Sequence, residues 1–316
     1  MANKINKPLC ATEFGNTGFG DCFLEPAKFA GAIQVPSNFA IAESDVATLQ
    51  DFLTNKITAA IGTRIIPYHN FISVADNSED LAITTTDYGA KYITREGFYD
   101  WTYRYLQGGV QLHQSIQKNQ GSNKFFIFYD DNGVIYGYKK NGTLTGILVD
   151  IFHANPWRIA TGADVPQYLL RYIINPKYLN GGNLGFIPTA NIGFNMFDIA
   201  GIQDVTIELV STASNVSVVK AFTSISNVDL HDAFAAALAR TTAWTATNNF
   251  GNPVQITSVV DNAGAGGWTI TFLAGNWNAS DTVSLGLTTA ALLSASPINM
   301  VGYECVEPLV IEAPAS

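Results

Sequence analysis

The sequence predicts a mainly β protein with a minor helical part: a β-barrel or β-sandwich domain with flanking helices, followed by a second, Ig-like β-sandwich domain. Short alternating or apolar runs bounded by Asn, Gly and Pro recur along the chain, as they do in antiparallel sheets. Only three segments carry the spacing of an amphipathic helix. "Ig-like" refers to architecture alone, because the Cys–Trp–Cys pattern of true Ig domains is missing.

The composition favours a protein that meets other subunits. Hydrophobic residues make up 47% of the 316 residues and charged residues only 14%, against about 25% charged in an average globular chain. Interface cores are poor in charge and rich in aromatic residues, although a neutral, exported β protein would have a similar composition. The net charge of −9 and the lack of a Lys/Arg run argue against direct nucleic-acid binding. An acidic lining would suit a channel through which DNA slides.

The N-terminal sequence has no apolar core of a secretory signal, and no run approaches 18 apolar residues. We therefore expect no membrane partner, and synthesis and assembly in a cytoplasm. The three cysteines are Cys10, Cys22 and Cys305. Their odd number and wide spacing predict free thiols, with a Cys10–Cys22 disulfide as the alternative.

The first elements in chain order are an arm and a helix. Residues 1–43 are rich in Gly, Phe and Pro and predict an N-terminal arm, in which Phe14 and Phe19 are candidate interface residues. A tucked-in irregular segment is equally consistent. Residues 44–61 predict the clearest helix, with Ser44 or Asp45 as N-cap and Gly62 just after its end. One stripe of this helix is apolar: Val46, Leu49, Leu53, Ile57 and Ile61.

Residues 63–106 predict strands, and the last of these places four large aromatic residues on one face. The aromatic face is either part of the core or a face between subunits, so its members are the main interface candidates. They are Tyr99, Trp101, Tyr103 and Tyr105.

A short helix over about 110–118 precedes a predicted meander of strands at 124–130, 134–139 and 144–152. The turns Asn132-Gly133 and Asn141-Gly142 carry the residue pair that type I′ hairpins prefer. A further strand is expected at 167–174. The first β domain would then span 44–199.

Residues 200–316 predict the C-terminal β-sandwich domain. Five short strand-like runs recur at sandwich spacing, and one helix interrupts them near residues 229–239, with Asp229 as its N-cap.

We expect no catalytic residue, cofactor site or metal site. The Gly-rich segment 15–20 neither follows a strand nor opens a helix, as a dinucleotide loop must. Ser115-x-x-Lys118 lacks the partner motifs of serine acylases. Asp130-Asp131-Asn132-Gly133 is better explained as a hairpin turn than as a calcium loop. The four histidines are scattered, His231-Asp232 suggests helix-cap chemistry, and Asp76, Glu79 and Asp80 form at most a weak cation site.

An aromatic β-segment, a short helix, the meander DDNGVIYGYKKNGTLTGI and a β-sandwich domain follow one another in this chain. This order resembles virion structural proteins of tailed phages, in particular those infecting Bacteroidetes, and most closely a tail tube subunit with an appended C-terminal domain. The resemblance covers about residues 45–175 and 200–316 and lies in element order, with no diagnostic motif.

The resemblance implies six-subunit rings that stack around a channel. The partners would be further copies of the chain, other virion proteins and passing DNA that is not bound specifically, and the protein would be located in the virion. The strands at 63–106 and 124–152 would form the ring sheet, the helix at 110–118 would support its outside, and the arm would contact neighbours.

Two other classes stay open. A capsid shell or decoration protein, including a double jelly-roll, fits the length, although a spine-helix capsid needs a helix longer than the 17 residues of 45–61. A receptor- or glycan-binding adhesin would fit a solvent-facing aromatic groove.

Overall fold

The computed structural model describes residues 4–5, 27–105, 109–159, 168–180, 183–273 and 282–312. The protein is mainly β, as the sequence predicts, and consists of several sheets, one of which curves into a half-barrel. All strand pairs are antiparallel among the described residues except β14 (Gln203–Ala213) with β20 (Tyr303–Glu304), which is parallel. The chain divides into two compact units. Unit 1 comprises residues 1–56 and 61–200, and unit 2 comprises residues 57–60 and 201–316, so the division lies next to the boundary expected near residue 200.

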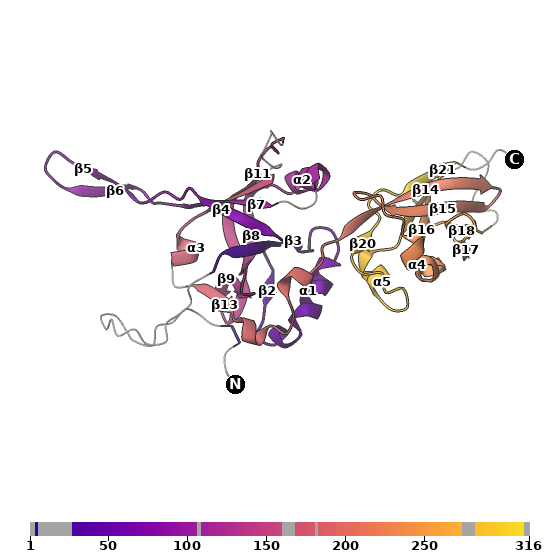
Figure 1. Cartoon of the computed structure of the whole chain (residues 1–316), viewed down its shortest axis with the longest axis horizontal. Helices are drawn as coiled ribbons and strands as arrows, with labels where there is room; N and C mark the ends of the chain where they lie inside the picture. Colours follow the sequence, from indigo (N-terminus) through magenta and orange to yellow (C-terminus); the bar gives the residue numbers. More distant parts are fainter. Residues whose placement is uncertain are drawn as a thin grey trace. The chain divides into compact units, whose positions relative to one another are not determined.

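Unit 1 contains the half-barrel, an eleven-stranded sheet that runs β2-β10-β9-β8-β11-β12-β7-β4, with β1 paired to β3 and β8 and β13 paired to β9 (Figure 1). Inside the curve lies a core rich in aromatic rings, centred on Tyr172, Phe126 and Phe128, which are all fully buried. The strands are β1 (Phe29–Val35), β2 (Ala40–Ile41), β3 (Ile66–Tyr68), β4 (Phe71–Asp76), β7 (Tyr99–Tyr105), β8 (Gly121–Asp130), β9 (Ile135–Lys140), β10 (Thr143–Thr145), β11 (Ile147–Ala154), β12 (Tyr168–Ile174) and β13 (Leu184–Ile187).

The helical segments of unit 1 are short. A 3-10 turn, η1 (Asp45–Thr48), runs into α1 (Leu49–Ile57), and α2 (Gly109–Lys118) lies where the sequence predicts a helix. Three short segments follow β12: α3 (Lys177–Asn180), η2 (Thr189–Asn191) and η3 (Met196–Asp198).

The helix predicted over 44–61 is shorter than expected. The apolar stripe is buried as far as Ile57, but Ile61 is 76% exposed and lies beyond the helix end. Ser44 makes no side-chain cap bond, while the Asp45 carboxylate accepts a hydrogen bond from the Ala42 N–H at 2.9 Å. Gly62 has a positive φ of 92°, but in a turn several residues after the helix.

The predicted arm over 1–43 is wrong from Phe29 onward. β1 pairs with β8 along six positions and with β3 along three, so residues 29–35 lie inside the sheet. Ala32 and Ile33 are almost fully buried. Phe14, Phe19, Cys10 and Cys22 lie outside the described residues, so their predicted roles stay predictions.

The predicted meander is present only in part. β8, β9 and β10 pair in order, but the strand expected over 144–152 divides at Gly146, and β11 pairs with β8 instead of β9.

The two turns of the meander also differ. Asn141 and Gly142 both have positive φ (50° and 80°), as a type I′ turn requires. At the other turn only Gly133 does (78°). The buried Asp130 carboxylate accepts the N–H groups of Asn132 and Val134, both at 2.9 Å, and favours a longer turn closed by a left-handed glycine. The type I′ prediction is therefore wrong at Asn132-Gly133.

Unit 2 packs a five-stranded sheet, β17-β18-β15-β14-β20, against a three-stranded sheet, β16-β19-β21. Trp268 and Trp244, one from each sheet, lie in the shared core with ring centroids 5.8 Å apart. The strands are β14 (Gln203–Ala213), β15 (Val216–Thr223), β16 (Trp244–Asn248), β17 (Ile256–Asn262), β18 (Gly267–Phe272), β19 (Thr282–Leu287), β20 (Tyr303–Glu304) and β21 (Leu309–Glu312).

Unit 2 has more helix than expected. Besides α4 (His231–Leu238), the described residues include the 3-10 turn η4 (Thr241–Ala243) and α5 (Ala290–Ser294), so the prediction of a single helix is wrong. The N-cap of α4 is Leu230, although the Asp229 carboxylate accepts a hydrogen bond from the His231 N–H at 2.8 Å.

Sheet edges in both units carry irregularities. β4 is an edge strand of the half-barrel, and its pairing register shifts at Ile72. β17 is an edge strand of the five-stranded sheet, and its register shifts at Thr257.

Candidate functional site

The most distinctive surface feature of unit 1 is a hairpin that leaves the half-barrel between β4 and β7. Its strands, β5 (Ala82–Thr85) and β6 (Lys91–Arg95), form a two-stranded sheet of their own. Figure 1 shows this ribbon extending away from β4 and β7. We call residues 77–98 the hairpin arm. From residue 77 to residue 96 every side chain except that of Ala82 is exposed.

The hairpin arm displays apolar side chains that the sheet beneath it does not cover. Ile83 lies directly opposite Ile93, and they are 55% and 63% exposed. Tyr88 lies in the turn at the tip and is 99% exposed. The tip closes with hydrogen bonds from Thr86 N to Ala90 O and from Gly89 N to Thr86 O, both 2.8 Å, and Gly89 takes the positive φ that this turn requires. The tyrosine is therefore presented by a defined turn.

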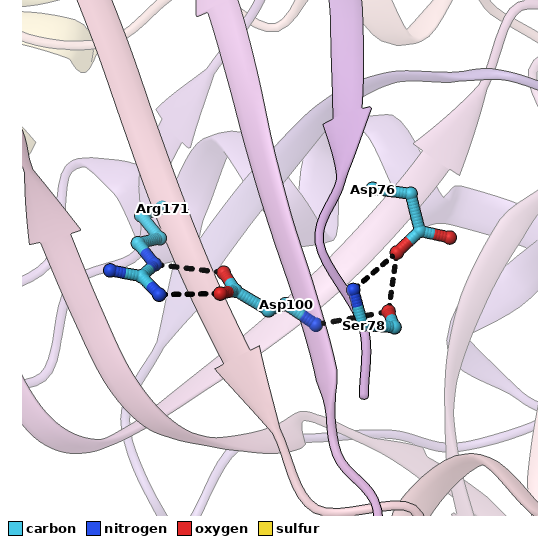
Figure 2. Close-up of polar contacts among 4 residues, drawn as sticks. All are labelled: Asp76, Ser78, Asp100 and Arg171. Atoms are coloured by element: carbon cyan, nitrogen blue, oxygen red, sulfur yellow. Dashed lines mark hydrogen bonds and ion pairs between the residues drawn. The ribbon is translucent and has the colours of Figure 1, made fainter. Parts of the chain in front are cut away.

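The base of the hairpin arm is held by a polar cluster of four residues, Asp76, Ser78, Asp100 and Arg171, which we call the polar root (Figure 2). Arg171 on β12 donates two hydrogen bonds to the Asp100 carboxylate on β7, at 2.8 and 2.5 Å. Asp100 N donates to Ser78 Oγ at 3.1 Å, and Ser78 in turn donates its N–H (3.0 Å) and its hydroxyl to Asp76. The root thus connects three neighbouring segments at the point where the ribbon leaves the sheet.

Charge and burial explain why the root is strong. Asp100 is only 2% exposed, and a buried carboxylate needs a paired cation and hydrogen bonds. The bidentate bonds to Asp100 raise the pKa of Arg171 above its ordinary value. Farther out, Glu79 and Phe98 exchange two backbone hydrogen bonds of 3.0 Å, and Arg95 pairs with Glu79 in an exposed position. A side chain at Gly97 would place its Cβ 2.3 Å from the Glu79 carbonyl oxygen, so only glycine allows this approach.

Removing the Asp100 carboxylate by Asp100→Ala should destabilise unit 1 by about 1–3 kcal/mol, because Arg171 would lose its partner. We place the loss below the full cost of breaking a buried pair because the Arg171 side chain is 43% exposed. Urea unfolding measures the loss, and hydrogen exchange of residues 77–98 should rise in the variant. The matched control is Glu79→Ala, which breaks an exposed ion pair on the same arm and should cost about 0–1 kcal/mol. Equal losses in the two variants would contradict a special role for the root.

The four aromatic interface candidates of β7 face the core of unit 1. Tyr103 and Tyr105 are 3% and 4% exposed, whereas Tyr99 and Trp101 are half-buried. Tyr103 stacks on Phe71 with a centroid distance of 4.7 Å, and burial raises its pKa well above the ordinary value for tyrosine. The core interpretation that the sequence left open is the one that the packing supports. An interface role for the exposed parts of Tyr99 and Trp101 stays a prediction.

Several other residues considered for chemistry have structural partners. Asp76 belongs to the polar root, and Glu79 pairs with Arg95. The described residues hold no cluster of three or more His, Cys, Asp or Glu able to bind a metal. His231 contacts Asp261 at 2.7 Å, which joins α4 to β17. The Cys305 thiol is half-buried, and burial raises its pKa.

The sequence predicts strands within residues 63–106, but it does not predict that two of them, β5 and β6, leave the half-barrel sheet. The available signal was a Thr-rich alternating run around Asp87-Tyr88-Gly89, which indicates a hairpin without saying what covers it.

No family model matches the chain, and no curated protein is similar enough in sequence to count as a match. None of the helices among the described residues is both long and apolar enough to cross a membrane.

Proposed function

We propose that this chain is a self-assembling virion structural protein, a tail tube subunit that forms stacked hexameric rings around a DNA channel. The observation that carries the proposal is the hairpin arm. A lone two-stranded hairpin is marginally stable in water, and the apolar side chains of this one are exposed to solvent. A partner surface that covers Ile83, Ile93 and Tyr88 would recover that loss.

A second copy of the chain is the partner that a homopolymer supplies. Aromatic side chains presented at the centre of a contact carry much of the binding energy of interfaces, and Tyr88 is fully exposed at the tip. The low content of charged residues, 14%, agrees with large contact areas between copies. The virion and the tail are suggested by the order of elements predicted from the sequence, which resembles that of tail tube subunits.

Helix length supports a tube over a spine-helix capsid. The longest α-helix among the described residues is α2, with ten residues, and α1 has nine. A capsid shell or decoration protein of another fold, such as a double jelly-roll, is the second candidate. The adhesin alternative receives less support, because the β7 aromatics face inward rather than forming a solvent-facing groove.

Passing DNA would be a partner without specific binding. The net charge of −9 disfavours tight contact with phosphates. This negative charge suits a conduit better than a DNA-packaging surface.

Negative-stain electron microscopy of the purified full-length chain tests the proposal. We expect six-fold rings or tubes, with a repeat about one subunit deep. Monomers or trimers that persist at high protein concentration would contradict a tube, and closed shells would favour the capsid alternative.

A further inference from the structure

The turns at Asn132-Gly133 and Asn141-Gly142 share a dipeptide whose chemistry goes beyond turn formation. A glycine after an asparagine places no side chain beside the backbone nitrogen, so that nitrogen can approach the side chain of the asparagine. Both asparagines are exposed, and by residue type the two pairs are equivalent. A third pair, Asn180-Gly181, lies partly outside the described residues. The structure holds the pairs at 132 and 141 in different ways.

The reaction open to such a pair is deamidation through a cyclic imide. The glycine nitrogen gives its proton to a solvent base and attacks Cγ of the asparagine. The new N–Cγ bond closes a five-membered ring, the Cγ–Nδ2 bond breaks, and the leaving nitrogen takes up a proton and departs as ammonia. Water then opens the ring at either carbonyl and gives aspartate or isoaspartate. The glycine N–H must therefore be free to lose its proton, and the turn must be free to rotate into the ring geometry.

The turn at Asn132 meets neither condition. The Gly133 N–H donates to the Asp130 carbonyl oxygen at 2.9 Å, and the Asn132 N–H donates to the Asp130 carboxylate at 2.9 Å. The carbonyl oxygen of Asn132, which belongs to the peptide bond that would react, accepts a hydrogen bond from the Thr189 hydroxyl at 2.7 Å. The buried carboxylate of Asp130 also disfavours a second negative charge on a nitrogen beside it. These contacts protect the pair.

The turn at Asn141 leaves its reacting atoms open. The Gly142 N–H has no acceptor among the described residues. Apart from its chain neighbours, no atom lies within 4 Å of the place that a Cβ on Gly142 would take. The hydrogen bond from the Thr143 hydroxyl to the Lys140 carbonyl, at 2.8 Å, joins the flanking residues and does not hold the peptide bond between Asn141 and Gly142. The exposed Lys140 ammonium also favours a negative charge on the nearby nitrogen.

We propose that Asn141 is a site of spontaneous deamidation in the folded protein and that Asn132 is protected from the same reaction. The product carries one more negative charge on a chain whose net charge is already −9. In isoaspartate the main chain runs through Cβ and Cγ, so the two-residue turn becomes longer by one atom. β10 begins directly after this turn, and its fully buried Leu144 pairs with Ile41 of β2. The isoaspartate form therefore loosens the β9–β10 hairpin at its tip.

Ageing of the full-length chain in mildly alkaline buffer, followed by peptide mapping with mass spectrometry, tests the proposal. Asn141 should be converted to aspartate and isoaspartate at least about tenfold faster than Asn132, because the hydrogen bonds that hold the Asn132 turn must open first. A parallel sample in concentrated urea loses those bonds, so the two sites should then react within about threefold of each other. Thr189→Val removes the hydroxyl that holds the Asn132 carbonyl. It should raise the rate at Asn132 about threefold and leave the rate at Asn141 unchanged.

Equal rates at the two sites in the folded chain would overturn the proposal. A difference that persists unchanged in urea would also overturn it, because the flanking sequence and not the fold would then be responsible. If Thr189→Val reacts at Asn132 no faster than the wild type, the Thr189 hydroxyl does not protect this pair.

Discussion

Replacing Ile83 and Ile93 together with aspartate should leave the chain folded and strongly weaken the assembly proposed above. Both side chains lie on one face of the hairpin arm and outside the core of unit 1. Two carboxylates there would face the partner and each other, so we expect the concentration needed for assembly to rise at least about 100-fold. The free energy of unfolding of the monomer should change by no more than about 1 kcal/mol. Sedimentation velocity and urea unfolding measure the two quantities.

The matched control places the same charge on the opposite face of the same ribbon. Thr84 and Thr94 alternate with the two isoleucines along the strands, and their hydroxyls lie 3.5 Å apart. Thr84→Asp with Thr94→Asp should weaken assembly by less than about tenfold. If both pairs of substitutions abolish assembly equally, charge alone and not the apolar face is responsible. If neither does, the arm is not a contact between copies.

Tyr103→Asp should unfold unit 1. The side chain is almost fully buried, with Phe71 stacked on it and Tyr172 edge-on at 5.7 Å. No Lys or Arg of the described residues is buried, so a carboxylate in this position would lack a partner in the core. We expect a loss of about 4 kcal/mol or more, which is a large part of the stability of a typical domain. Near-ultraviolet circular dichroism and urea unfolding would detect the loss of packing.

Tyr103→Phe is the conservative counterpart, since it keeps the ring and its stacking. It should cost about 1 kcal/mol or less. Tyr103→Asp should lose folding and assembly together, whereas the arm substitutions should lose assembly alone, and this contrast separates a core position from a contact position. A Tyr103→Asp chain that folds and assembles normally would contradict the core assignment.

The fold was predictable from the sequence where local chemistry determines local structure. Asn141-Gly142 produced the expected turn because both residues accept positive φ. Asn132-Gly133 did not form a type I′ turn, because the Asp130 carboxylate accepts hydrogen bonds that favour a different turn. The residue types alone do not predict those hydrogen bonds. The helix expected as far as residue 61 ends at Ile57 although Ile61 continues the apolar spacing. Periodicity shows which residues could share a face, but not whether anything covers the last of them.

The candidate site was less predictable, because sequence periodicity does not show which residues are covered by others. Alternation identifies residues 82–95 as strands, yet whether such strands lie within a sheet or leave it depends on partners distant in sequence. The four β7 aromatics were equally ambiguous, and only the position of Phe71 and Tyr172 assigns Tyr103 to the core. The opposite error occurred at residues 29–35. The Gly-, Phe- and Pro-rich composition of the N-terminal segment suggested an arm there, but β1 lies inside the half-barrel.

The register shifts in β4 and β17 bear on how this protein avoids amyloid-like aggregation. An even, unpaired strand edge is a template on which any passing strand can grow. The extra residues at Ile72 and Thr257 twist these two edges and interrupt their regular rows of donors and acceptors. Random edge-to-edge growth is thereby slowed at both places. Contacts between copies would then depend on side chains, which fit together in one geometry.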